Sequence, residues 1–271
     1  MRIEVQTFLK EHGIRLNTEL GQHFLIDEEI LQSIVKAADI QPTDHIVEIG
    51  PGIGVLTVEL LKRAAHVTAI ELDDRMIPLL KTYVATKLPG NIATKLEVIH
   101  GNALHTPMPS KQYRIVANIP YHITSPLLRH VFLESEVHPE SMILLIQREV
   151  AEKICDSQDC GLLTILVGLF GSPKIIRKVP PECFLPPPAV DSAVLHIQCF
   201  EKPLADAVTI EEVFRLVKIA FSQKRKMLRN TFGPFPDLME RLSALQIDEK
   251  RRPQTLSVEE WIALAKMKVK N

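Results

Sequence analysis

The tetrad Asn118-Ile119-Pro120-Tyr121 combines an amide, a proline and an aromatic ring directly after the apolar run 113–117, which predicts a buried strand. The side-chain carbonyl oxygen of Asn118 can accept a hydrogen bond. Pro120 keeps its neighbours out of helical geometry, so that a backbone carbonyl stays free to accept a second one. Tyr121 supplies a ring face for stacking. The tetrad could therefore hold a planar amine, although such residues also form ordinary turns after strands.

A glycine-rich turn lies upstream, where the spacing of apolar residues predicts a strand at 45–49 and a helix at 55–64. Gly50, Gly52 and Gly54 fall between these two elements. Glycines at such a place let the backbone turn sharply and let a ligand approach where a side chain would collide. The same turn could also serve only to join strand and helix in a doubly wound sheet.

A carboxylate and the glycine spacing indicate which ligand the turn would hold. The next predicted strand, 66–70, is followed by Glu71, about 20 residues after Gly50, where a carboxylate is suited to bind both hydroxyls of a ribose. The dinucleotide fingerprint places its third glycine one position later than Gly54, and Pro51 interrupts the pattern. The spacing therefore disfavours NAD and a dehydrogenase. It favours a nucleoside without a pyrophosphate, such as S-adenosylmethionine (SAM).

Three further residues would complete a nucleoside site. A third predicted strand, 96–99, leads into Asn102 and Ala103, and the carboxyl ends of parallel strands meet at one edge, where ligands bind. Asn102 could hydrogen-bond the amine of an adenine ring, and Leu72 and Ala103 could cover the two faces of that ring. Asn is also simply a common turn residue.

The elements that must position these residues alternate between strand and helix patterns from 45 to 147, with two late strands predicted at 174–179 and 193–200. This order predicts an α/β fold, with a Rossmann-like, mostly parallel sheet and helices on both faces.

Helical periodicity dominates the C-terminal part of the chain. Capping boxes are predicted to begin at Thr209 and Ser257. We therefore expect a catalytic domain over 1–200 and a small all-helical domain over 201–271.

The net charge of −1 hides an excess of positive charge in the C-terminal part. Residues 200–271 hold 14 Lys and Arg against 10 Asp and Glu, and Lys224, Arg225, Lys226 and Arg229 stand together without an acid between them. A helix there would place Arg225 and Arg229 on one face, which suits a nucleic-acid phosphate backbone. A solvated helix face is the alternative interpretation.

Composition excludes several classes of protein. The chain has 271 residues, 46% of them apolar, which is enough to bury a sizeable core. No apolar run reaches the length of a membrane span and the first residues do not resemble a signal peptide, so we expect a cytoplasmic protein without a membrane partner. The four cysteines lack metal-ligand spacing, and no metal is expected.

With these motifs in this order, the chain resembles the ribosomal RNA small-subunit adenine dimethyltransferases. Three more segments carry the resemblance, 20–25 (LGQHFL), 184–192 (FLPPPAVDS) and 221–230 (FSQKRKMLRN), so it covers nearly the whole chain. It implies an enzyme that uses SAM to dimethylate the exocyclic amines of two adjacent adenines in a hairpin near the 3′ end of 16S rRNA. It also implies a monomer that acts on the 30S subunit and contributes to its biogenesis.

The resemblance also implies roles for individual residues. In the family, SAM is held at positions matching His23, Leu25, Gly50, Glu71, Asn102 and Asn118. Together with Gln22 from the first of these segments and the turn residues above, the expected cofactor-binding set is Gln22, His23, Leu25, Gly50, Gly52, Glu71, Leu72, Asn102, Ala103 and Asn118. The family usually carries Asp at the position of Asn102. An Asn carbonyl can still accept the adenine amine's hydrogen bond, but without charge assistance.

The expected catalytic residues are Asn118, Pro120, Tyr121 and Phe184. The Asn118 side-chain oxygen and the Pro120 carbonyl would each accept one N–H of the target amine, which directs its lone pair at the methyl donor. Phe184 is implied to stack on the target base opposite Tyr121, although it could equally be a core residue.

Two other functions remain open. A related group of methyltransferases modifies one adenine of large-subunit rRNA. A non-catalytic factor of the same fold could instead assist small-subunit assembly. The intact tetrad and Glu71 favour an active enzyme.

Overall fold

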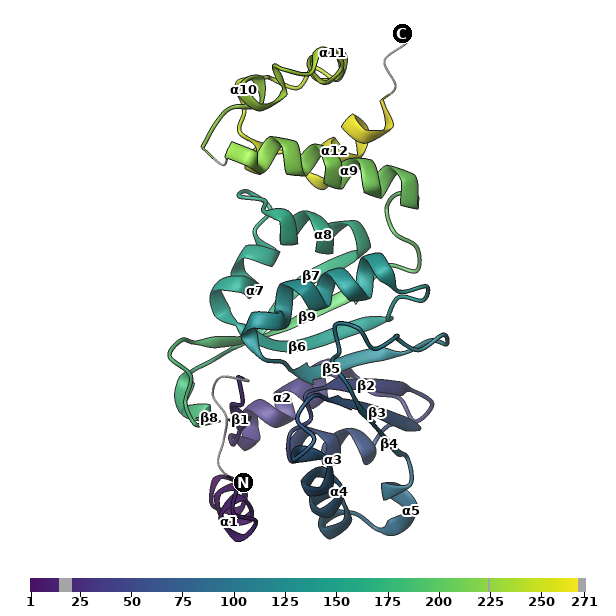
Figure 1. Cartoon of the computed structure of the whole chain (residues 1–271), viewed down its shortest axis with the longest axis vertical. Helices are drawn as coiled ribbons and strands as arrows, with labels where there is room; N and C mark the ends of the chain where they lie inside the picture. The colour runs from purple at the N-terminus through teal and green to yellow at the C-terminus, as the bar shows by residue number, and fades with distance from the viewer. Residues whose placement is uncertain (15–20, 224, 268–271) are drawn as a thin grey trace. The chain divides into compact units, whose positions relative to one another are not determined.

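The computed structural model describes residues 1–14, 21–223 and 225–267 and divides the chain into two compact units (Figure 1). Unit 1 comprises Met1–Glu152 and Pro173–Cys199, and unit 2 comprises Lys153–Ser172 and Phe200–Asn271. The segment 153–172 therefore groups with the C-terminal helices rather than with the sheet. No helix of the described ranges is long and apolar enough to cross a bilayer.

Unit 1 alternates strands and helices. Its elements are α1 (Arg2–Glu11), β1 (Phe24–Leu25), α2 (Glu28–Ala38), β2 (His45–Ile49), α3 (Val55–Leu61), β3 (His66–Glu71), α4 (Met76–Lys87), α5 (Gly90–Ala93), β4 (Leu96–His100), β5 (Arg114–Asn118), η2 (Tyr121–Ile123), α6 (Thr124–Arg129), η3 (His130–Glu134), β6 (Ser141–Gln147), the first part of α7 (Arg148–Cys155), most of β7 (Gly171–Val179), η4 (Pro181–Cys183), β8 (Phe184–Leu185) and β9 (Ser192–Cys199).

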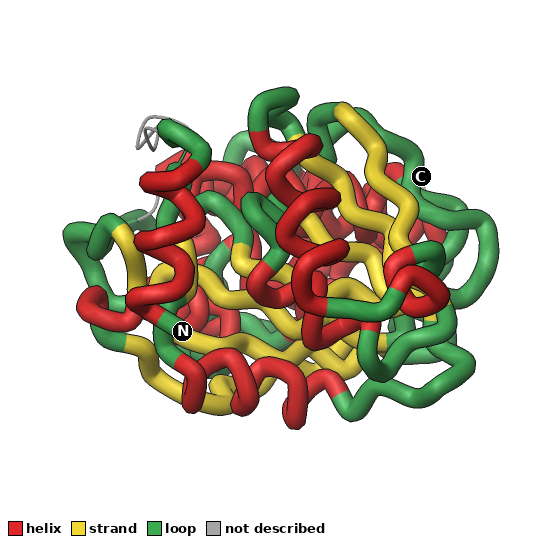
Figure 2. Tube along the Cα trace, turned by 90° about the horizontal axis from the view of Figure 1, so that it is seen from below, coloured by secondary structure: helices red, strands yellow, loops and turns green. Residues whose placement is uncertain are grey.

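Seven strands form one sheet in the order β4-β3-β2-β5-β6-β9-β7. The pairs β4–β3, β3–β2, β2–β5 and β5–β6 are parallel, and β9 runs antiparallel to β6. The predicted α/β class with a mostly parallel sheet is confirmed, and helices lie on both sides of the strands (Figure 2). The chain runs from β2 to β3 and β4 on one side of β2 and then crosses back to β5 on the other side. The crevice beyond the strand ends at such a reversal is where these folds bind ligands.

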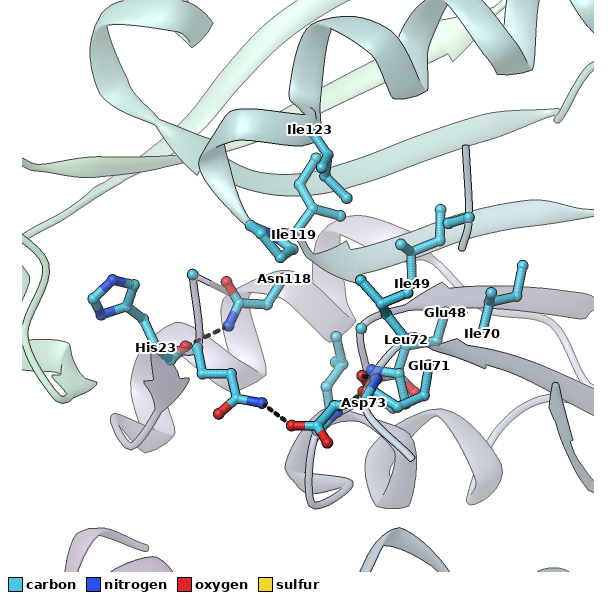
Figure 3. Close-up of a pocket in the computed structure, with 18 of the residues that line it drawn as sticks. His23, Glu48, Ile49, Ile70, Glu71, Leu72, Asp73, Asn118, Ile119 and Ile123 are labelled. Carbon is cyan, nitrogen blue, oxygen red and sulfur yellow. Dashed lines mark hydrogen bonds between the residues drawn. The ribbon is translucent and has the colours of Figure 1, made fainter. Parts of the chain in front are cut away.

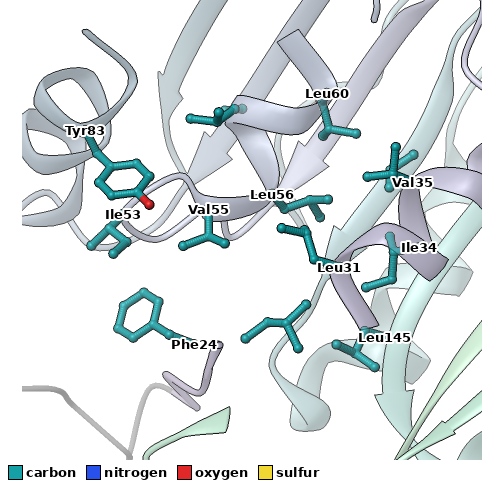
Figure 4. Close-up of a cluster of buried hydrophobic side chains, with 14 of the residues drawn as sticks. Phe24, Leu31, Ile34, Val35, Ile53, Val55, Leu56, Leu60, Tyr83 and Leu145 are labelled. Carbon is teal, nitrogen blue, oxygen red and sulfur yellow. The ribbon is translucent and has the colours of Figure 1, made fainter. Parts of the chain in front are cut away.

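Both faces of the sheet are buried. Ile46 and Val116 lie in a cluster with side chains of α2, α3 and α4, whereas their neighbours Val47 and Ile115, which point to the opposite face, are also 0% exposed. This explains why the strands read as continuous apolar runs rather than as alternating patterns. Figure 4 shows part of the cluster that contains Ile46 and Val116. Side chains of α2 and α3 lie there together with Phe24 and Leu145.

Helix α2 shows how local sequence builds this packing. Asp27 caps its start, since its carboxylate accepts a hydrogen bond from the Ile30 N–H at 3.0 Å. Ile30, Ile34 and Ala38 then recur at helical spacing on the buried face. Burial of a side chain such as Ile34, 1% exposed, contributes about 1.5–3 kcal/mol.

Unit 2 is helical. Its elements are the end of α7, α8 (Leu162–Phe170), α9 (Ala207–Ala220), η5 (Phe221–Gln223), α10 (Leu228–Phe232), α11 (Pro236–Ala244), η6 (Pro253–Thr255) and α12 (Val258–Lys266). Helix α12 contacts α8, α9 and α11, and its Trp261 is 0% exposed.

One of the two predicted capping boxes is confirmed. The Ser257 hydroxyl accepts from the Glu260 N–H, and the Glu260 carboxylate accepts from the Ser257 N–H. The box predicted at Thr209 is wrong. Asp206 caps α9 instead, because its carboxylate accepts from the Thr209 N–H at 2.8 Å and starts the helix earlier.

Candidate active site

A cavity of about 270 Å³ lies at the carboxyl ends of β2, β3, β4 and β5, within unit 1 (Figure 3). Its wall comes from the segments 21–25, 48–52, 55–56, 70–73, 101–104 and 118–123. All ten residues expected to bind the cofactor line it, and so do Asn118, Pro120 and Tyr121. The structure thus brings together segments that are up to about a hundred residues apart in the chain, as expected for strand ends of a parallel sheet.

Glu71 is fixed by the glycine turn. Its Oε2 atom accepts a hydrogen bond from the Gly52 N–H at 3.0 Å, and its Oε1 atom accepts one from the Asp73 N–H at 2.9 Å. Gly52 has a φ of +58°, and an added Cβ would lie 2.4 Å from the Phe24 ring, so only glycine fits there. Burial raises the pKa of Glu71, while these backbone hydrogen bonds oppose the rise. The carboxylate keeps further lone pairs that a pair of hydroxyls can use.

Glu48 also lines the cavity, and the sequence interpretation missed it. It is 2% exposed and accepts a hydrogen bond from the Thr57 hydroxyl at 2.6 Å. Burial, together with the nearby Glu71 charge, raises the pKa of Glu48 to about 8 against the opposing effect of Thr57. The signal that could have found it is an acid inside the apolar strand β2.

The Asn118 amide is held in one orientation. Its Nδ2 atom donates to the His23 carbonyl at 2.9 Å, drawn as a dashed line in Figure 3, and this leaves Oδ1 as the atom available to a ligand. The turn after it packs closely, since a Cβ on Gly21 would lie 2.9 Å from the Cβ of Pro120.

The prediction that the Pro120 carbonyl is free is wrong. It accepts the Ile123 N–H at 3.1 Å, because the chain enters the short helix η2 immediately after the proline. A carbonyl oxygen has two lone pairs, so one remains for a ligand.

The aromatic ring of the tetrad, Tyr121, lies against the ring of His23. The rings of His23 and Tyr121 are stacked, with centroids 6.0 Å apart and planes inclined by 15°. The Tyr121 hydroxyl shares a 2.6 Å hydrogen bond with Ser192, and His23 Nδ1 lies 2.8 Å from the Pro186 carbonyl oxygen. Burial raises the pKa of Tyr121. Both rings are therefore held in place, and Tyr121 is a neutral ring at the cavity wall.

Phe184 is not part of the cavity wall. It pairs with Leu25 in the small β1–β8 sheet and is 1% exposed within the hydrophobic core. In this conformation the side chain has the packing of a core residue, which was the alternative role considered for it.

Asn102 lines the cavity, but its Oδ1 atom accepts a hydrogen bond from the Leu104 N–H at 3.0 Å. The amide oxygen expected to receive an adenine amine is therefore already engaged. Leu72, 55% exposed, and Ala103, 6% exposed, lie at the same end of the cavity and offer apolar surface to a ring.

The basic residues of unit 2 do not form the predicted helical stripe. Helix α10 begins only at Leu228, so Arg225 lies in a turn and Arg229 in the helix. The reason is that the N–H groups of Leu228 and Arg229 donate to carbonyls of Arg251 and Glu249. Arg225, Lys226 and Arg229 are exposed and have no ion-pair partner in the described part of the chain, whereas Lys224 lies outside it.

Within residues 1–14, 21–223 and 225–267, no group of three His, Cys, Asp or Glu side chains could hold a metal ion.

Comparisons with known proteins agree with this arrangement. A family model described as "Ribosomal RNA adenine dimethylase" matches residues 13–270. A ribosomal RNA small subunit methyltransferase A from Dehalococcoides mccartyi is 38% identical over 270 residues, which cover 95% of this chain and 90% of the relative. A crystal structure of a dimethyladenosine transferase from Plasmodium falciparum has a TM-score of 0.79 at 29% identity and covers 89% of this chain and 96% of that chain. The 23S rRNA methyltransferase ErmE has a TM-score of 0.72 at 25% identity, with 89% and 98% covered.

Proposed function

Since the chain belongs to the ribosomal RNA adenine dimethylase family, we propose that it dimethylates the exocyclic amines of two adjacent adenines in a hairpin near the 3′ end of 16S rRNA, with SAM as the methyl donor. The observation that carries the proposal is that one cavity is lined both by Glu71 and by the tetrad that begins at Asn118. A methyl donor and an amine can meet only if both sites open into the same space.

The residues present fit this donor. Glu71 would bind the ribose hydroxyls with lone pairs left after its two backbone bonds. Leu72 and Ala103 would cover the faces of the base, and the glycine turn would let the ligand approach the backbone. When bound, SAM supplies a methyl group that is activated by its positively charged sulfur.

The tetrad would orient the target amine. An adenine amine is a poor nucleophile because its lone pair is delocalised into the ring. The Asn118 Oδ1 atom and the remaining lone pair of the Pro120 carbonyl would each accept one N–H, which draws the amine toward tetrahedral geometry. Tyr121 would stack on the base once it is flipped out of the RNA. No residue has to remove the proton first, because it can leave after the methyl group has been transferred.

The RNA would be held electrostatically by unit 2. Arg225, Lys226 and Arg229 are exposed and unpaired in the described ranges, and we assign Lys224 to the same contact from sequence alone. The proposal includes a cytoplasmic monomer that acts on the 30S subunit during its biogenesis, with a catalytic domain over 1–200 and an RNA-binding domain over 201–271.

Incubation with labelled SAM and unmethylated 30S subunits, 50S subunits or free 16S rRNA tests this function. We expect label only in the 30S sample, on two adjacent adenines after mapping, and labelling slower by about 10²–10³-fold with the Asn118→Ala variant. Label in 50S subunits would favour the large-subunit methyltransferases, to which ErmE belongs by name. Tight binding to 30S subunits without any label would favour a non-catalytic assembly factor.

A further inference from the structure

The side chain of Asn102 is oriented by a local turn after β4. Its Oδ1 atom accepts the Leu104 N–H at 3.0 Å, and its backbone carbonyl accepts the N–H groups of His105 and Thr106, each at 2.9 Å. A backbone N–H can only donate, so the side-chain atom facing Leu104 must be the oxygen. A flipped amide would place two donors against each other.

The other polar atom of this side chain is left for a ligand. Asn102 lines the cavity, and its Nδ2 atom donates to no residue in the described ranges and is not fully buried. An NH2 group is a donor only. A ligand at this end of the cavity therefore meets a donor at Nδ2 and an acceptor, Oδ1, that it must share with Leu104.

A carboxylate at position 102 would behave differently. One oxygen would accept the Leu104 N–H as Oδ1 does now, and the second oxygen would present an acceptor where Asn102 presents a donor. An adenine amine is a donor and pairs with an acceptor. The 6-keto oxygen of hypoxanthine occupies the same position on the ring and pairs with a donor.

We propose that Asn102 sets the base selectivity of the cofactor site, and that it makes this site accept a 6-keto purine nucleoside nearly as well as an adenine nucleoside. The inference rests on the proposed use of SAM and concerns the same cavity.

Calorimetry on the full chain tests this with two probes, S-adenosylhomocysteine and its 6-keto counterpart S-inosylhomocysteine. For the unaltered chain we expect dissociation constants within about tenfold of each other, because at position 6 each probe has one favourable and one unfavourable contact. The N1 atom, an acceptor in adenine and an N–H donor in hypoxanthine, differs between the probes in every variant alike, so the change of the ratio on substitution reports position 6. For Asn102→Asp we expect the adenosyl probe to bind more tightly and the inosyl probe more weakly, so that their ratio grows by about tenfold or more. Asn91→Asp, an exposed site in α5, adds the same charge and should leave the ratio unchanged.

The outcomes separate this inference from the proposed function. If the unaltered chain binds the adenosyl probe but rejects the inosyl probe by about a hundredfold, or if Asn102→Asp leaves the ratio as it was, the role of Asn102 is refuted while the cofactor site stands. If neither probe binds the unaltered chain or the variants, the assignment of the cavity to SAM fails and this inference fails with it.

Discussion

Asn118 is oriented before any ligand arrives, because its Nδ2 atom already donates to the His23 carbonyl. Asn118→Ala removes the Oδ1 acceptor without enlarging the core, since the side chain is only half-buried. We expect methyl transfer at saturating SAM to slow by about 10²–10³-fold, as for the loss of one positioned hydrogen-bonding group. Single-turnover methylation of 30S subunits measures this. A rate within about twofold of the unaltered chain would remove Asn118 from the chemistry.

A substitution at Glu71 tests the part of the cavity that is proposed to bind the cofactor. In Glu71→Gln an NH2 group must face either the Gly52 N–H or the Asp73 N–H, both of which now donate to the carboxylate, so one backbone bond is lost. We expect the dissociation constant of S-adenosylhomocysteine to rise by about tenfold. Glu11→Gln, an exposed substitution of the same kind, is the control. Equal affinities in a calorimetric titration would mean that Glu71 does not contact the ribose.

Glu48 makes the stability of the fold depend on pH. Its pKa is raised from 4.5 to about 8, so between these values the native chain keeps a proton that the unfolded chain releases. Its contribution is therefore complete below the unfolded pKa and is lost as the pH rises through the folded pKa. Glu48→Gln cannot ionise, so we expect its urea midpoint to fall less between about pH 5 and about pH 8 than that of the unaltered chain. If the urea midpoints of the two proteins fell equally over this pH range, Glu48 would not be a buried neutral acid.

The sequence identified most of the residues around the cavity but not their hydrogen bonds. Glu71 was recognisable because it follows a strand about 20 residues after Gly50, and Asn118 was recognisable because it opens a polar and aromatic tetrad directly after an apolar strand. The engaged oxygens of Pro120 and Asn102 were not, because their partners are backbone N–H groups two or three residues further on, and such bonds depend on the exact turn. Glu48 was overlooked because it lies within a strand rather than after one.

At the level of elements, the glycine turn between β2 and α3 has no room for a side chain. Gly52→Ala combines a positive φ with a Cβ that would lie 2.4 Å from the Phe24 ring, and we expect it to lower the unfolding free energy by about 3 kcal/mol. Gly13→Ala shares the positive φ, +64°, but meets nothing within 4 Å, so about 1 kcal/mol is expected. Gly90→Ala has neither feature and should be nearly neutral. Urea unfolding of the three variants measures the series, and equal losses at positions 13 and 52 would exclude the clash with Phe24.

Strands were predicted better than helix ends. The strands β2, β3, β4 and β5 all lie within about two residues of their predicted positions, because a buried parallel strand is a short apolar run with clear limits. The start of α9 was misplaced because two competing caps, Asp206 and Thr209, stand three residues apart. The break before α10 depends on hydrogen bonds to residues 249–251, which no local pattern reveals.

At the scale of the whole molecule, the helical unit is built from two separate stretches of chain, 153–172 and 200–271. Within it, Gly168 of α8 lies so close to α12 that an added Cβ would be 2.7 Å from Val258. The boundary expected at residue 200 put the segment of α8 in the catalytic domain. A fragment that begins at residue 201 would lack this helix, so binding experiments require the full chain.

The basic residues of unit 2 provide the whole-molecule prediction. Each Lys or Arg that contacts a phosphate steepens the salt dependence of RNA binding by about one unit of logarithmic slope. Replacing Arg225 and Arg229 by Ala should therefore weaken binding to 16S rRNA and flatten that slope by about two. The control replaces Lys81 and Lys111, exposed cations of unit 1, by Ala. Filter binding over a series of salt concentrations measures the affinity and the slope for each protein. An identical slope in the unaltered chain and in both variants would mean that Arg225 and Arg229 do not contact the RNA.

The close contact between Gly21 and Pro120 links two positions that are far apart in the chain. A larger side chain at 21 would displace Pro120, which lines the cavity. The φ of +72° at Gly21 also disfavours any side chain there, whatever residue occupies position 120. An engineer who wishes to widen the mouth of this cavity for a bulkier amine would therefore have to keep Gly21 and begin at another residue of its wall.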